Sequence, residues 1–169
     1  MRRDPDMTGS ELELITQYLD YQRETVLSKT DGLDREQMGR RHPPSDLTLA
    51  GLLFHLALVE EDWSQVRFGG GPDREPWSGI DWDADPNWEF RTARAMEPGD
   101  LRERYRLACK RTRDVVAAAG NLDAVSARPL RDGRHFSLRW MLLHLIEETA
   151  RHAGHADFLR EAVDGSVGE

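Results

Sequence analysis

The last long run of the chain, residues 137–164, constrains the fold more than any other stretch. It reads SLRWMLLHLIEETARHAGHADFLREAVD, contains no proline, begins with a serine suited to cap a helix and is followed at once by Gly165. These features predict a single helix of about seven turns. At about 100° per residue, one side of that helix carries a stripe that we expect to face a core, made of Met141, Leu145, Glu148, His152, Ala156 and Leu159.

Two members of this stripe, Glu148 and His152, lie one turn apart in an otherwise apolar seam. Burying an unpaired carboxylate there is costly, so the pattern calls for a partner. A divalent metal would serve, because a carboxylate oxygen and an imidazole nitrogen from successive turns can converge on one ion, which then needs a third ligand from a facing helix. Two other interpretations do not need a metal: a histidine that is hydrogen-bonded within the core, or a glutamate and a histidine that form a pair on the surface. The pattern alone leaves these interpretations and the metal site open.

Apolar residues recur at helical spacing in three earlier stretches, each introduced by residues suited to cap a helix. The predicted helices cover residues 10–30, 48–68 and 99–120, with caps at Ser10, Thr48 and Asp100. Together with the terminal helix, they predict an all-α fold, a four-helix bundle that forms a single domain over residues 1–169. We expect negligible strand content.

The connection between the second and third helices, residues 69–98, is long for a helical bundle. It has roughly thirty residues, whereas helix–helix connections usually have about two to eight. Such a crossover lets the third helix run parallel to the second, which predicts an up-down-down-up topology. Large apolar side chains are concentrated in it and should pack over an end or a flank of the bundle, namely Trp77, Trp82, Trp88 and Phe90. They either anchor the loop or form a lid that touches a ligand.

Composition narrows the class of protein. A net charge of −8 argues against nucleic acid as the main partner, because that partner rewards clustered lysine and arginine. No apolar run approaches the length of a membrane span and no leader pattern stands at the N-terminus, so neither a membrane partner nor secretion is expected, and we predict a cytoplasmic location. The single cysteine, Cys109, fits a reducing compartment, and we interpret it as an inert core thiol rather than a nucleophile.

His55 is the candidate third ligand, since it lies on the edge of the apolar stripe of the second helix. Two histidines and one carboxylate leave a fourth position open for water or substrate, which is the pattern of catalytic rather than structural zinc. A ligating imidazole usually donates its other N–H to an acceptor, and the candidates for this outer layer are His155, Asp62 and Asp157.

Two segments carry a resemblance to a known group of proteins. The H-x3-E-x3-H pattern at His144, Glu148 and His152, followed by AGHADFLRE, and HLALVEEDW beginning at His55 together resemble the DinB-like superfamily of bacterial four-helix-bundle metalloproteins. The resemblance extends over nearly the whole chain and is closest to the actinobacterial branch related to the N-terminal domains of mycothiol-dependent maleylpyruvate isomerases. It implies that His55, Glu148 and His152 hold the metal, and that the protein forms a homodimer through its bundle faces.

The resemblance also implies a function. The expected cofactor is a divalent metal, zinc or nickel first, and the expected cosubstrate is mycothiol. We therefore expect a metal-dependent enzyme that transfers a low-molecular-weight thiol to an electrophilic small molecule. Two alternatives stay open, a metal-dependent hydrolase that uses metal-bound water and a non-enzymatic stress protein that binds a metal or ligand. Turnover without added thiol would distinguish the hydrolase.

Overall fold

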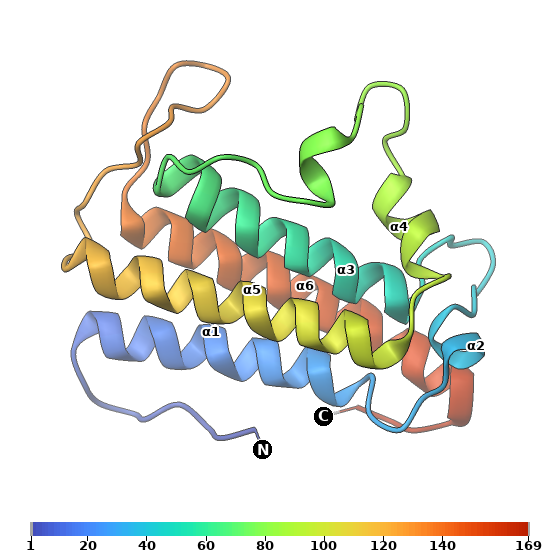
Figure 1. The fold of residues 1–169 in the computed structure, drawn as a ribbon. Coiled ribbons are helices and arrows are strands. Elements are labelled where there is room, and N and C mark those ends of the chain that lie inside the picture. Colours follow the sequence, from blue (N-terminus) through green and yellow to red (C-terminus); the bar gives the residue numbers. More distant parts are fainter. Residues whose placement is uncertain (1, 169) are drawn as a thin grey trace.

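The computed structural model describes residues 2–168, and its regular elements are helices (Figure 1). Four long helical segments are present: α1 (Glu11–Ser28), α3 (Leu49–Glu60) continued without a break by the π-helical η1 (Glu61–Phe68), α5 (Pro98–Ala119) and α6 (Leu138–Asp164). Three short helices lie between them: α2 (Arg35–Met38), η2 (Trp77–Gly79) and α4 (Trp88–Ala93). Within residues 2–168 there is no strand, only one isolated bridge, so the predicted all-α class is confirmed.

The helix starts follow the capping signals in the sequence, with one exception. Ser10 and Thr48 accept hydrogen bonds from the backbone N–H groups three residues ahead, as predicted. The prediction of Asp100 as the cap of α5 is wrong, because the helix begins at Pro98 with Glu97 as its N-cap. Proline has its φ preset for the first helical position, and Asp100 instead places its negative charge in the first turn, where the helix dipole favours it.

The long helices pack around two clusters of buried apolar side chains. The helix α1 packs against α6, and α3 packs against both α5 and α6. Figure 1 shows α1 and α6 running in one direction along the molecule and α3 and α5 running in the other. The helix α3 is the most deeply buried, because its LAGLLFHLAL segment is apolar on every side, and its fully covered residues include Leu52, Leu53, Phe54, Leu56 and Ala57. In the part of the chain that the structure describes, no helix combines the length and apolarity needed to cross a bilayer.

The connection after η1 packs on the bundle, as its aromatic content predicts. Trp77 is buried, lies 4.5 Å from Phe54 between ring centroids, and donates its indole N–H to Glu61 at 2.8 Å. The short helix α4 lies directly over α3 at Gly51, where an added Cβ would come within 2.7 Å of Phe90. A glycine is therefore required at position 51 for α4 to approach this closely.

A polar network crosses the middle of the bundle. Arg23 of α1 donates two parallel hydrogen bonds to Glu60 of α3, at 2.7 and 2.6 Å, and the two side chains are 3% and 1% exposed. Thr112 of α5 donates to the same carboxylate at 2.6 Å. Burial alone would lower the pKa of Arg23, but the Glu60 carboxylate outweighs it and holds that pKa above its usual value. The network ties three helices together through one buried charge pair.

Candidate metal centre

Two helices supply the three predicted ligands. His55 comes from α3, and Glu148 and His152 come from successive turns of α6. One nitrogen or oxygen atom from each lies within 4.8 Å of the other two. The Nε2 atoms of His55 and His152 lie 3.4 and 3.2 Å from the same oxygen, Oε1 of Glu148. The structure therefore brings together all three residues of the predicted ligand set.

The surroundings of this cluster suit a divalent cation. Burial lowers the pKa of His152, and the adjacent His55 ring lowers it further, so this imidazole is neutral near pH 7 and its lone pair is free for a ligand bond. Arg151 contacts the other oxygen of Glu148, Oε2, at 3.3 Å from the solvent side. The atoms that converge are thus two imidazole nitrogens and one carboxylate oxygen, a donor set that fits zinc and other first-row metals.

The three candidates for the outer layer have different surroundings. His155 Nδ1 lies 3.2 Å from His152 Nδ1, on the side of the ring that faces away from Glu148. Asp62 pairs with Arg67 at 2.6 Å, and Asp157 pairs with Lys29 at 2.6 Å. The structure therefore brings His155 to a ligand residue and pairs the two aspartates with cations of other segments. An outer-layer role for any of the three stays a prediction.

Sequence reasoning missed two residues that contact His55. Glu89 of α4 places its Oε1 3.4 Å from His55 Nδ1, and Phe90 stacks on the imidazole with ring centroids 5.4 Å apart. Both belong to the long connection, where no periodicity marks which side chain faces inward. The available signal was an acidic residue between two large aromatic ones, Trp88 and Phe90, in a segment already expected to pack on the bundle.

A cavity of about 520 Å³ opens beside His55, between η1 and the residues of the connection that follow it. Its walls combine indole rings, aliphatic groups and charged side chains, including Trp63, Trp77, Trp82, Ile80, Arg74 and Arg131. Neither Arg74 nor Arg131 has an ion-pair partner among the described residues. The cavity can therefore accept a ligand with both apolar and polar parts next to the cluster.

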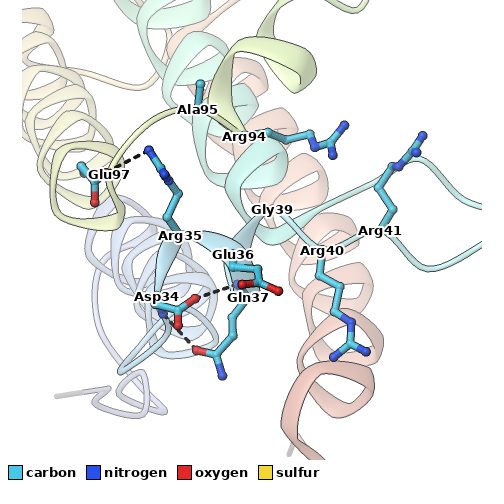
Figure 2. A pocket seen from close by; sticks show the side chains of 10 residues that line it. All are labelled: Asp34, Arg35, Glu36, Gln37, Gly39, Arg40, Arg41, Arg94, Ala95 and Glu97. Atoms are coloured by element: carbon cyan, nitrogen blue, oxygen red, sulfur yellow. Dashed lines mark hydrogen bonds and ion pairs between the residues drawn. The ribbon is translucent and has the colours of Figure 1, made fainter.

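A larger cavity, about 1030 Å³, lies at α2 and the end of α4 (Figure 2). None of the three cluster residues lines it. Part of its polar lining is already paired, since Arg35 contacts Glu97 at 3.4 Å and the Asp34 side chain accepts from the backbone of Gln37. The metal-ligand chemistry of the chain is therefore next to the smaller cavity.

Cys109 lies in the core, where burial raises the pKa of its thiol far above the usual range, and its Sγ contacts Glu60 at 3.8 Å.

We expect the Cys109 thiol of the folded protein to react with a thiol-directed reagent more than about tenfold slower than that of the unfolded chain, because the nucleophile is the thiolate. Kinetics of reaction with an aromatic disulfide, with and without denaturant, would measure this. Equal rates would contradict the inert role, as would loss of catalysis in a folded Cys109→Ser variant.

Comparison with known proteins bears on this site. No curated protein matches the chain. A family model described as mycothiol-S-transferase matches residues 14–165, which include the four long helical segments except for the first three residues of α1. This is a DinB-like family, so the resemblance inferred from the segments around His55 and Glu148 is confirmed. Its name supports an enzyme with a transferase role that uses a thiol and a small-molecule substrate. The chain belongs to the mycothiol-S-transferase family.

Proposed function

We propose that this protein is a divalent-metal-dependent transferase that joins a low-molecular-weight thiol of the mycothiol type to an electrophilic small molecule. The observation that carries the proposal is the convergence of His55, Glu148 and His152 beside a cavity large enough for small substrates. In the reaction, the thiol loses its proton to solvent and its sulfur forms a bond to the electrophilic carbon. The bond between that carbon and the leaving group breaks, and the leaving group departs with the bonding electron pair. Zinc and nickel are the first candidates for the metal.

The three ligand residues would hold the ion between α3 and α6, where the single carboxylate of Glu148 would balance only part of its positive charge. A divalent ion bound there would lower the pKa of a thiol and favour the thiolate, which is the nucleophile. The thiol has to come from outside the chain, because Cys109 is buried elsewhere in the core. This requirement agrees with the thiol in the family's name.

The residues of the connection shape the substrate space. Trp77 is fixed by its hydrogen bond to Glu61, so one aromatic wall of the cavity is rigid. Arg67 also lines the cavity, pairs with Asp62 and lies over the Trp63 ring, 5.1 Å from its centroid, which holds this second aromatic side chain in place. These walls would exclude water from an electrophile placed near His55 and orient its polar groups toward the arginines.

We also propose that the four long segments form an up-down-down-up bundle, which the helix directions in Figure 1 support. In such a bundle, the crossover after η1 lies on the side of the site and can supply the walls of the cavity. A cytoplasmic location and a homodimer remain predictions.

The activity test uses zinc- or nickel-loaded protein, mycothiol and a panel of alkylating electrophiles. We expect conjugation of thiol to electrophile that requires both metal and thiol and falls by more than about 100-fold in His55→Ala, since removal of an outer partner alone typically costs about 10- to 100-fold. Mass spectrometry of the products would measure it. The control is His144→Ala, which changes another histidine of α6 that is not part of the cluster.

Two other results would contradict the proposal. Turnover that is unchanged when the thiol is omitted would identify a hydrolase that uses bound water. Stoichiometric metal without turnover across a broad panel of electrophiles would identify a binding protein instead.

A further inference from the structure

The His55 ring lies between two carboxylates. Its Nε2 faces Glu148 within the cluster, and its Nδ1 faces Glu89 at 3.4 Å. Glu89 is 6% exposed, its Oε2 has no hydrogen-bond partner, and it makes no other ion pair within residues 2–168. His55 Nδ1 likewise lacks a hydrogen bond of good geometry, so the two groups face each other with their bonding capacity unused.

The other buried carboxylates of the bundle provide a comparison. Glu60 has Arg23 and Thr112 as partners, and Glu61 has Arg111 and the Trp77 indole. Burial of a carboxylate without such partners destabilises the folded state, because the charge loses its hydration and gains nothing in return. The fold therefore gives no structural reason for a glutamate at position 89. Within residues 2–168, its one ion-pair partner is His55, a residue of the proposed metal site.

The similar surroundings of the His55 and His152 imidazoles give a reason for a glutamate at position 89. Both point Nε2 at Glu148 Oε1, and each has its Nδ1 next to a polar group, His155 in the case of His152 and Glu89 in the case of His55. Histidines that bind metals commonly donate their second ring N–H to a carboxylate, which fixes the tautomer and the ring orientation. The arrangement around His55 has the atoms required for that bond.

We propose that Glu89 is a positioning residue that accepts a hydrogen bond from Nδ1–H of His55 and thereby directs the Nε2 lone pair toward the metal position. This inference rests on the proposed metal site. A rotation of the carboxylate would complete the bond, because the atoms are already within 3.4 Å. The stacked Phe90 ring and the close contact of α4 with Gly51 hold Glu89 at this distance, so the connection reaches the site through α4.

The test compares Glu89→Gln and Glu89→Leu with the wild type in zinc affinity, measured by competition with a chelating indicator. We expect zinc to bind about tenfold more weakly to Glu89→Gln, which keeps the shape and loses the charge, and about 100-fold more weakly to Glu89→Leu, which removes the acceptor. The metal-free melting temperature of Glu89→Leu should stay the same or rise, because an incompletely paired buried carboxylate is removed. If Glu89 had a purely structural role, the melting temperature of metal-free Glu89→Leu would fall.

A second readout needs no metal. Nitrogen-15 NMR of the histidine side chains in the metal-free protein should show the Nδ1–H tautomer of His55 in the wild type and a shift toward the Nε2–H tautomer in Glu89→Leu. The matched control is Glu61→Gln, another buried carboxylate that holds the same connection through Trp77. It should alter stability without changing zinc affinity or the His55 tautomer.

The outcomes separate this inference from the proposed function. A wild type that binds zinc, with Glu89→Leu equal to it in affinity and tautomer, would overturn the role of Glu89 and leave the metal site standing. A wild type that binds neither zinc nor nickel would overturn both. Weakened zinc binding together with the tautomer shift, and neither change in Glu61→Gln, is the result that the inference predicts.

Discussion

Replacing Arg23 with leucine is expected to lower the free energy of unfolding by about 3–5 kcal/mol, which is typical when one partner of a buried ion pair is removed. The change leaves Glu60 buried at 1% exposure with only Thr112 and the weak thiol donor of Cys109 as partners. It also removes two hydrogen bonds that join α1 to α3, both from Arg23 to Glu60. Denaturant unfolding followed by circular dichroism would measure the difference.

The control for this prediction is Arg113→Leu, which removes an arginine from an exposed pair with Asp20. Exposed ion pairs contribute about 0–1 kcal/mol, so this variant should stay close to the wild type. The double variant Arg23→Leu with Glu60→Leu should be more stable than Arg23→Leu alone, because no buried charge is left unpaired. If Arg23→Leu and Arg113→Leu have the same free energy of unfolding, the buried pair stabilises the fold no more than the exposed pair does, and the prediction is wrong.

Replacing His152 with alanine is expected to remove most of the stabilisation that zinc gives to the folded protein. Loss of a residue that only hydrogen-bonds to a metal ligand lowers metal affinity by about 10- to 100-fold, so loss of a ligand itself should lower zinc affinity by more. Zinc at about 1,000 times its Kd stabilises a protein by about 4 kcal/mol, and a 100-fold weaker site leaves about 1.4 kcal/mol at the same concentration. Thermal unfolding with and without zinc would measure both values.

The matched control is His144→Ala, on the same helix two turns earlier. His144 stacks on Trp140 and contacts the Trp63 ring edge to face, and it is not part of the cluster within 4.8 Å. This variant should lose some packing energy yet keep the full zinc-dependent shift. Equal loss of the shift in both variants would mean that the α6 histidines act through packing rather than through a specific ligand set.

The long helices could be predicted from the sequence because local chemistry specifies where they begin. The capping box of Ser10 and Glu13 and the Thr48 cap set the starts of α1 and α3 within one residue of prediction. The cluster was also predictable, since Glu148 and His152 occupy one stripe of an unbroken helix, where the spacing of about 100° per residue holds.

The other side chains around His55 could not be predicted, because their positions depend on geometry that local sequence patterns do not encode. The direction of the Asp62 side chain could not be read from α-helical spacing, because Asp62 lies in η1, whose π-helical turns rotate successive side chains differently. Glu89 lies on the six-residue helix α4, whose position depends on the long-range contact of Phe90 with Gly51. The helix α4 is too short to show a hydrophobic period from which its inward face can be read.

The most direct test of the account is elemental analysis of protein purified without a polyhistidine tag, after incubation with zinc or nickel and removal of free metal. The account predicts about one equivalent of metal in the wild type and in His144→Ala, because His55, Glu148 and His152 form one site, and little in His55→Ala or His152→Ala. Equally little metal in the wild type and in His152→Ala would contradict the proposed centre.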